Sequence, residues 1–319
     1  MINSKIIGTG SYLPSKIMTN FDLEKMVETS DEWIVERTGI KERHIASENE
    51  LTTDLALKAS ENAIASSNIS KDDIDLIVFA TTTPDRTFPS CGTILQRKLG
   101  LTEKAFAFDV QAVCCGFVCA MSVADSFIKS GKAKTALVVG AETLSRIVNW
   151  QDRGTCVLFG DGAGAVILQA TDEDKGVLNV QLHSDGNYND LLYTDGGVSL
   201  NQKSGSIFME GREVFKLAVN KMADCVIQNL NKCGLTLEDI DLLIPHQANK
   251  RIIDGVGKKL GLSPEKVVST VQNHANTSAG SIPLAMDFAV KNNMVKDGDI
   301  VVLEAFGGGL TWGSIIVKW

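Results

Sequence analysis

The chain has 319 residues, of which 44% are hydrophobic and 22% are charged, and it contains 28 glycines but only 6 prolines. This is the composition of an ordinary globular protein, and it excludes a disordered tail protein, a collagen and a miniature domain held by disulfides. At about 150 residues per domain, the length predicts roughly two domain-sized units. The formal charge of −8 argues against a nucleic-acid-binding face, so no nucleic-acid partner is expected.

Two further features bear on location and redox state. The N-terminal segment has no basic start followed by a long apolar stretch, so we expect no secretion signal and a cytoplasmic protein. The longest nearly uncharged apolar run has 15 residues, between Asp109 and Asp125. It is shorter than the roughly 20 residues of a membrane-spanning helix, and it predicts a helix buried on all sides and no membrane partner. The cysteines form no CxxC pair, which is typical of reduced thiols; they are Cys91, Cys114, Cys115, Cys119, Cys156, Cys225 and Cys233.

Three sequence patterns recur in the same order in the two halves of the chain. In the first half they are an amphipathic helical pattern, the run DIDLI and the apolar run TALVV, at 54–66, 73–77 and 135–139. In the second half the corresponding stretches lie at 214–230, 239–243 and 300–303. Three matches in one order indicate a duplicated unit of helix and strands.

The predicted strands are short, continuous apolar runs, which is the pattern of strands buried on both faces by helices. We therefore predict an α/β fold with two related halves, 1–171 and 172–319, each a mixed sheet with helices on both sides. The Gly-, Asn-, Ser- and Asp-rich stretch at 172–211 predicts a loop or linker between them. Ligands in such folds bind beyond the carboxyl ends of the strands, so residues that follow the apolar runs are the candidates for a site.

Cys114 follows the predicted strand at 105–110, at the start of the predicted buried helix. Unpaired backbone N–H groups and the helix dipole at such a position favour the thiolate over the thiol. Packing in a tight core is the common alternative for any single cysteine, and it is the expectation for Cys115 and Cys119. The spacing of cysteines and histidines does not favour a metal cluster.

Three segments of the second half also follow predicted strands or precede a helix. His246 stands directly after the apolar run at 241–244, and a satisfied structural histidine is its alternative interpretation. The turn-rich segment 273–280 contains Asn276 and leads into a helix around Ala285, for which a helix cap is the alternative. The glycine run at 307–309 allows a backbone N–H to approach a ligand closely, although a tight turn would also need it.

The segment GDGAG at 160–164 resembles part of a dinucleotide fingerprint. The residues after it, AVIL, continue as a strand and open no helix, so no helix dipole would face a pyrophosphate. We predict a tight turn between two strands at this position.

The segments AVCCGF, PHQAN, HANTSAGSIP and EAFGGG, in this order and spacing, resemble β-ketoacyl-acyl-carrier-protein synthase III, the initiating condensing enzymes of bacterial type II fatty acid synthesis. The likeness extends from IIGTGSYLP near the N-terminus to GGGLTWGS near the C-terminus. It implies the thiolase fold, a duplicated five-layered α/β/α/β/α arrangement, with the nucleophilic cysteine in the first half and the histidine and asparagine in the second.

Matched to the motifs of this family, Cys114 is the implied nucleophile, with His246 and Asn276 as its catalytic partners. The backbone N–H groups of Cys114 and Gly308 are the implied oxyanion hole. The position after the nucleophile is usually small in the family and is Cys115 here; the register with Gly116 and Phe117 assigns the reaction to Cys114. The implied coenzyme A contacts are Thr29, Trp33, Arg37, Arg153 and Asn249, with Trp33 and Arg153 on the two faces of the adenine. Phe88 is implied to close the acyl pocket across a homodimer. Arg251 is implied to dock the acyl carrier protein.

The resemblance implies a decarboxylative condensation of an acyl-CoA, acetyl-CoA first, with malonyl-acyl-carrier-protein, without a metal or redox cofactor. The helix N-terminus and His246 are expected to lower the pKa of the Cys114 thiol from about 8.5 toward neutrality. A starter-unit condensing enzyme of polyketide or quinolone biosynthesis would use the same triad. A degradative thiolase would need a second cysteine near the C-terminal glycine run, and 305–313 contains none. A cysteine hydrolase and a non-catalytic scaffold are more remote alternatives.

Overall fold

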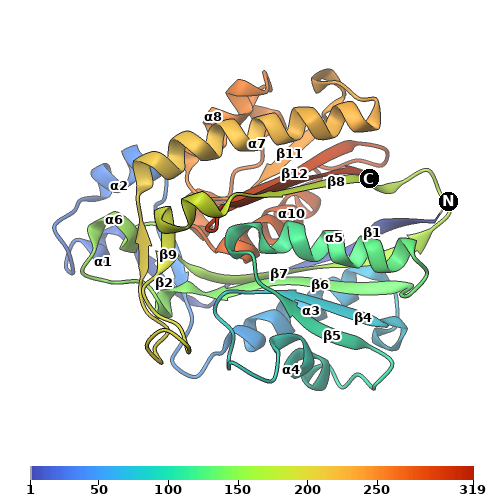
Figure 1. Cartoon of the computed structure of the whole chain (residues 1–319), viewed down its shortest axis with the longest axis horizontal. Helices are drawn as coiled ribbons and strands as arrows, with labels where there is room; N and C mark the ends of the chain where they lie inside the picture. The colour runs from blue at the N-terminus through green and yellow to red at the C-terminus, as the bar shows by residue number, and fades with distance from the viewer. Residues whose placement is uncertain (1) are drawn as a thin grey trace.

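Two large mixed sheets form the framework of the structure, a computed structural model that describes residues 2–319 (Figure 1). The strands of the first sheet run in the order β1 (Asn3–Tyr12), β7 (Asp161–Thr171), β6 (Thr135–Thr143), β4 (Leu76–Ala80) and β5 (Phe106–Val110). The strands of the second sheet run in the order β8 (Gly176–Ser184), β13 (Thr311–Lys318), β12 (Ile300–Gly307) and β11 (Leu242–Pro245). The strands of the first sheet thus precede all those of the second along the chain.

The two sheets alternate with three layers of helices (Figure 1). The layer outside the first sheet contains α3 (Thr52–Ser67) and α4 (Cys91–Lys98), the layer between the sheets contains α5 (Gly116–Lys129) and α10 (Ser281–Lys291), and the layer outside the second sheet contains α7 (Gly211–Cys233) and α8 (Lys250–Lys259). This arrangement confirms the predicted five-layered α/β/α/β/α fold.

Shorter elements cover one end of the sheets. They are β2 (Lys16–Thr19), α1 (Asn20–Leu23), α2 (Asp31–Thr38), β3 (Glu42–Ile45), α6 (Arg153–Cys156), β9 (Leu192–Thr194), β10 (Ile207–Met209) and α9 (Val271–His274). A separate apolar cluster lies beneath them, which includes Leu23, Ile34, Phe159 and Val271.

The duplication inferred from the three recurring patterns is visible in the strand pairing. In the first sheet, β1–β7 and β7–β6 are antiparallel and β6–β4 is parallel. In the second sheet, β8–β13 and β13–β12 are antiparallel and β12–β11 is parallel. Strand β5 pairs in parallel with β4, and its place in the second half is taken by one parallel bridge between Leu243 and Val267. The halves therefore share one topology, with the carboxyl ends of β4, β6, β11 and β12 at the same end of the molecule.

The prediction of a loop or linker over 172–211 is wrong for much of that range. Strand β8 is nine residues long and forms an edge of the second sheet, and β9 and β10 pair with each other further along. Edge strands need no continuous apolar run, because one side of the ladder faces solvent. The mixed sequence GVLNVQLHS therefore lacks the signal by which the central strands were recognised.

The predicted turn at 160–164 is also wrong, because Gly162 and Gly164 lie inside β7. A Cβ atom on Gly164 would lie 2.6 Å from the backbone N of Leu284. A Cβ atom on Gly140, in the neighbouring strand, would lie 2.1 Å from the carbonyl O of Ala279. These glycines permit close backbone packing between the first sheet and the segment that leads into α10. The continuation of the segment as a strand is confirmed.

The predicted buried helix is α5, which begins at Gly116 and packs between the two sheets. Phe117 and Met121 on this helix belong to the largest apolar cluster, together with residues of both sheets. Among residues 2–319, no helix is both long enough and apolar enough to cross a membrane.

Substitution of Gly164 by alanine is expected to destabilise the protein by about 3 kcal/mol, because the new methyl group collides with backbone atoms that cannot rotate away. Chemical denaturation of both proteins measures the difference. Gly186→Ala is the matched control, since a Cβ atom there meets nothing within 4 Å; its expected change is within about 0.5 kcal/mol. Equal stability of the two variants would contradict the packing role of Gly164.

Candidate active site

Cys114 lies in a short 3-10 turn, Val113–Cys115, between the end of β5 and the start of α5. The preceding residue, Val113, has a φ of 49°. A β-branched residue rarely adopts this left-handed conformation, so the turn is a strained one that the surrounding structure must hold. The helix begins two residues later than the sequence suggested, and the Cys114 side chain is 5% exposed.

The end of β12 lies directly against this turn. A Cβ atom on Gly307 would be 2.8 Å from the backbone N of Cys114 and 3.0 Å from that of Cys115. Only glycine fits at this distance. Gly308, the next residue, lines the same cavity as Cys114. The structure therefore brings together the two residues whose backbone N–H groups were predicted to form an oxyanion hole.

His246 follows β11 and is 2% exposed. Its backbone N–H donates to the carbonyl of Glu304, and its Nδ1 lies 2.6 Å from Oγ of Ser281. Ser281 Oγ accepts the backbone N–H of Gln247, so its own proton is available for Nδ1, which favours the tautomer with the proton on Nε2. Burial lowers the pKa of His246 to about 3, and the imidazole is therefore neutral at pH 7.

Asn276 lies just before a second 3-10 turn, Ser278–Gly280, and is 6% exposed. Its backbone exchanges hydrogen bonds with the segment around Phe159: Asn276 N–H donates to Leu158 O, and Gly160 N–H donates to Asn276 O. The side-chain Oδ1 accepts the backbone N–H of Ser278 at 2.8 Å. The Nδ2 group then remains as the donor that Asn276 can offer to a ligand.

One short segment joins the three predicted catalytic residues. The turn that carries Ser278 packs against the Cys114 turn, and Ser278 and Cys114 line one cavity. Asn276 precedes this turn, and Ser281 after it contacts His246. The segment 276–281 therefore connects all three residues.

The expected low pKa of the Cys114 thiol is wrong for this structure. Burial raises the pKa of Cys114 to about 12; the Ser278 side chain opposes the rise, and the carboxylate of Glu142 adds to it. The neutral His246 offers no positive charge to offset the desolvation. Burial under β12 thus outweighs the helix N-terminus, and the resting group is a thiol.

The other two cysteines of this region are packed, as predicted. Cys115 is completely buried in the cluster between the sheets, and the partly buried Cys119 packs against that cluster. The contact between the two side chains raises the pKa of the Cys115 thiol and lowers that of Cys119. Within the described residues, no group of three or more His, Cys, Asp or Glu side chains is placed to hold a metal ion.

A cavity of about 910 Å³ opens above Cys114. Its apolar lining includes Phe159, Leu192 and Ile207, and its wall includes 82–87, which follows β4. Among residues 2–319, those that line it do not include His246, Asn276 or Phe88. Phe88 is 82% exposed and does not line the cavity of its own chain.

Three of the predicted coenzyme A residues, Trp33, Arg37 and Arg153, form a second cluster, on α2 and α6. The guanidinium carbons of Arg37 and Arg153 lie 4.5 Å and 4.9 Å from the ring centroid of Trp33. Arg153 also donates to the carbonyl of Glu28, and the buried hydroxyl of Thr29 has no hydrogen-bond partner within the described chain. Arg153 rests directly on the indole, so an adenine bound between the two would have to part them.

The two remaining predicted contacts, Asn249 and Arg251, lie at the start of α8, where Asn249 is partly exposed and Arg251 is exposed. Asn249 caps this helix, where its Oδ1 accepts the backbone N–H of Ile252 at 2.9 Å, which leaves the amide NH₂ as a donor. Arg251 is exposed, and its guanidinium lies 5.4 Å from the ring centroid of Phe215.

The residues that hold the cavity wall were not among the predicted site residues. Three consecutive threonines, Thr81–Thr83, follow β4, and Glu142 near the end of β6 accepts hydrogen bonds from all three. Two signals in the sequence were available. Glu142 is a charged residue inside the apolar run of β6, and a run of threonines follows β4. Ser278 and Ser281 lay within quoted motifs but were given no role.

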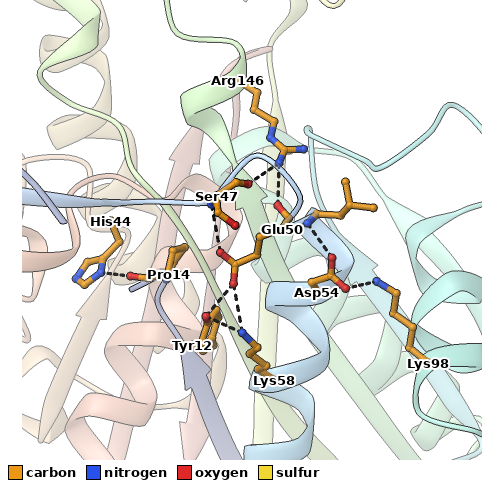
Figure 2. Close-up of polar contacts among 10 residues, drawn as sticks. Tyr12, Pro14, His44, Ser47, Glu50, Asp54, Lys58, Lys98 and Arg146 are labelled. Carbon is orange, nitrogen blue, oxygen red and sulfur yellow. Dashed lines mark hydrogen bonds and ion pairs between the residues drawn. The ribbon is translucent and has the colours of Figure 1, made fainter. Parts of the chain in front are cut away.

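Hydrogen bonds and an ion pair between side chains fix the turn that precedes α3 (Figure 2). Arg146, which lines the cavity, donates to the carbonyl groups of Ser47, Glu48 and Glu50 at 3.3, 3.3 and 2.8 Å. The carboxylate of Glu50 accepts the hydroxyl of Tyr12, and Lys58 contacts both groups. The start of α3, which carries the cavity-lining Thr52, is thereby held in place.

Comparison with known proteins agrees with this arrangement. Two family models match, 3-oxoacyl-(acyl-carrier-protein) synthase III over residues 108–186 and the C-terminal part of the same family over residues 230–319. The chain is 56% identical to β-ketoacyl-(acyl-carrier-protein) synthase III of Rhodospirillum centenum, over 100% of this chain and 99% of that protein. The crystal structure of 3-oxoacyl-(acyl-carrier-protein) synthase III from Aquifex aeolicus superposes with a TM-score of 0.95 at 48% identity, and covers 99% of this chain and 100% of that one. The priming β-ketosynthase of the R1128 polyketide pathway superposes with a TM-score of 0.94 at 32% identity, over 99% and 96% of the two chains.

The raised pKa of Cys114 predicts how its alkylation by iodoacetamide depends on pH. The rate is expected to be slow at about pH 7 and to rise about tenfold per pH unit up to about pH 10, because only the thiolate reacts. Peptide mapping by mass spectrometry measures the rate at Cys114, with Cys114→Ser to identify the peptide. A small thiol of ordinary pKa, about 8.5, serves as the control that levels off within this range. A plateau at Cys114 near neutrality would contradict the effect of burial.

Proposed function

We propose that this chain, which belongs to the 3-oxoacyl-(acyl-carrier-protein) synthase III family, condenses an acyl-CoA primer with malonyl-acyl-carrier-protein and so initiates type II fatty acid synthesis. Acetyl-CoA is the proposed primer. The observation that carries the proposal is the buried Cys114 turn beneath the glycine end of β12, at the base of a cavity. A cysteine hydrolase would not need the second cluster of Trp33, Arg37 and Arg153.

In the first half-reaction, the sulfur of Cys114 attacks the thioester carbonyl of the primer. A bond forms between this sulfur and the acyl carbon, the bond from that carbon to the coenzyme A sulfur breaks, and the thiol proton passes by way of His246 to the departing thiolate. The high pKa of Cys114 requires a proton acceptor during the attack. His246 serves as this acceptor in its other neutral tautomer, in which Nδ1–H donates to Ser281 Oγ and the lone pair of Nε2 takes the thiol proton. The N–H groups of Cys114 and Gly308 stabilise the tetrahedral oxyanion, and such donors are each worth about 2.7–4 kcal/mol.

In the second half-reaction, malonyl-acyl-carrier-protein loses CO₂, and negative charge builds on its thioester oxygen. The Nε2–H of His246 and the Nδ2 amide of Asn276 are the donors for that oxygen. The resulting carbanion attacks the acyl carbon on Cys114, a carbon–carbon bond forms, and the sulfur of Cys114 leaves with the electron pair. Neither step needs a metal or a redox cofactor, since the departing CO₂ drives the reaction.

The remaining predicted contacts define the proposed partners. Trp33, Arg37 and Arg153 would hold the nucleotide of coenzyme A, with Thr29 and Asn249 along its path to the cavity. Arg251, exposed on α8, would meet the acidic carrier protein.

Phe88 supports the proposal of a homodimer, because a phenylalanine that is 82% exposed beside the cavity wall would be covered by a second copy, whose own acyl cavity it would then close. A cytoplasmic location is proposed with these soluble substrates.

A second candidate is a starter-unit condensing enzyme of polyketide biosynthesis. The observation in its favour is the TM-score of 0.94 with the priming β-ketosynthase of the R1128 pathway. Comparison of acetyl-CoA with branched and longer acyl-CoA primers separates the two candidates.

The two half-reactions are expected to separate by mutation. His246→Ala and Asn276→Ala should abolish malonyl decarboxylation and leave part of the acetyl transfer to Cys114, because the donors to the malonyl oxygen are lost while the oxyanion hole remains. Intact-protein mass spectrometry after incubation with acetyl-CoA measures transfer, and release of labelled CO₂ measures decarboxylation. Cys114→Ser should take up no acetyl group, whereas the matched variant Cys115→Ala should. An acetyl group on any other residue, or equal loss of both activities, would refute the assignment.

The nucleotide contacts are expected to act on one substrate only. Trp33→Ala and Arg153→Ala should raise the KM for acyl-CoA by roughly tenfold, as loss of a cation–π and stacking contact of about 1–2 kcal/mol implies. The KM for malonyl-acyl-carrier-protein should change far less. Lys221→Ala is the control, because it removes a comparable contact, 4.6 Å from the ring centroid of Trp312, away from α2 and α6. A larger effect on the malonyl substrate would overturn the assignment.

A further inference from the structure

Glu142 is a completely buried carboxylate whose two oxygens accept from five donors. The donors are the side chain of Thr81, the backbone and side chain of Thr82, and the backbone and side chain of Thr83. Removal of a carboxylate from water is expensive, and burial raises the pKa of Glu142 to about 7, while the hydrogen bonds from Thr81–Thr83 oppose the rise. The same carboxylate raises the pKa of the Cys114 thiol, so its presence works against thiolate formation. Activation of the nucleophile therefore does not explain it.

The threonines that Glu142 binds form part of the cavity wall. Thr82 and Thr83 line the cavity together with Cys114, while Thr81 does not. Thr83 is held from two further sides: its hydroxyl accepts the backbone N–H of Thr143 at 2.9 Å, and its carbonyl accepts the hydroxyl of Thr52 at 2.6 Å. Without the carboxylate, the backbone N–H of Thr82 would have no acceptor, and that of Thr83 would keep only the hydroxyl oxygen of Thr81, at 3.0 Å.

The wall continues beyond these residues. Asp85, which also lines the cavity, accepts from the backbone N–H and the hydroxyl of Thr53 at the start of α3. Lys98 binds Thr53 and Asp54 at the same helix end, and Figure 2 shows its contact with Asp54. The segment 81–85 is thus fixed at its first three residues by Glu142 and at its last by α3.

We propose that Glu142 is a positioning residue that fixes the 81–83 wall of the cavity and thereby determines which acyl chains reach Cys114. This inference rests on the proposed function, because it takes the cavity to be the site of the primer. Glu142 touches no substrate and acts through the threonines. A carboxylate whose acceptor sites are all occupied holds the wall in place and gives the cavity a fixed depth. Against a fixed wall, two acyl chains that differ by one methylene group are discriminated by about 10–200-fold.

The test compares kcat/KM for acetyl-CoA with that for hexanoyl-CoA in Glu142→Gln. Glutamine keeps the size of the side chain, but its NH₂ group places two donors against the donors of Thr81–Thr83, so the hydrogen bonds to one of the two carboxylate oxygens are lost. The wall then relaxes, and the ratio of the two kcat/KM values should change by about tenfold. Malonyl decarboxylation does not use the wall and should stay within about twofold of the parent protein. Glu142→Asp, which keeps a carboxylate, should have a ratio nearer to that of the parent.

Asp161→Asn is the matched control. Asp161 is equally buried and accepts from the backbone N–H of Ala46 and from the backbone and hydroxyl of Ser145, none of which lines the cavity. Its loss should lower the unfolding temperature and leave the ratio unchanged. Thr81→Val supplies a second route if Glu142→Gln does not fold, since it removes one donor to Glu142 outside the lining, and its ratio should change in the same direction.

An unchanged ratio in Glu142→Gln, or in Thr81→Val where the first variant does not fold, overturns the inference. So does a ratio that changes as much in Asp161→Asn. Failure of the parent protein to form acetyl-Cys114 is a different result, and it refutes the proposed function itself.

Discussion

The close approach of Gly307 to the backbone of the Cys114 turn is the contact on which the site depends. It joins the end of a strand in the second sheet to a turn that leaves the first, and it leaves no room for a side chain. The turn begins at Val113, whose left-handed conformation a β-branched residue adopts only under constraint. The contact also removes Cys114 from water, and this is why its pKa rises although the turn leads into a helix. The same contact therefore places the backbone N–H groups for an oxyanion and keeps the Cys114 thiol protonated.

A second constraint is carried by glycines on the opposite side of the site. Gly140 and Gly164 let the backbone around 279–284 lie directly on the first sheet. Ser281, within that segment, then reaches His246, which belongs to the second half. Just before that segment, the Oδ1 of Asn276 accepts the backbone N–H of Ser278. Small residues in one half thus position polar groups of the other, and the fold and the chemistry cannot be separated here.

Much of the framework could be predicted from the sequence because the central strands are buried on both faces. Strands β4, β6, β11 and β12 read as continuous apolar runs, and the order of their repeats revealed the duplication. For the same reason, the residues after β11 and β12 were predicted as site residues, among them His246 and Gly308. Strand β8 escaped notice because an edge strand does not require such a run, and Gly162 and Gly164 were misread because their partners lie about 120 residues away in the chain.

The electrostatics were less predictable than the fold. The acidity of Cys114 depends on how closely β12 covers it, and no local pattern around 114 encodes that distance. Glu142 and its three threonines are separated by about 60 residues, and only the parallel pairing of β4 with β6 brings them together. Motifs predict which residues react. The resting protonation state of those residues depends on burial and on partners that are distant in the sequence.

The order of these parts along the chain has a consequence for biogenesis. A ribosome releases the Cys114 segment well before it makes β12, so the sulfur of a nascent chain is hydrated and has ordinary acidity until the last strands dock. Oxidants and electrophiles therefore threaten this sulfur most during synthesis or transient unfolding, when sulfenic acid and its irreversible successors can form. Docking of the C-terminal strands therefore protects the Cys114 sulfur of the newly synthesised chain from oxidation and alkylation.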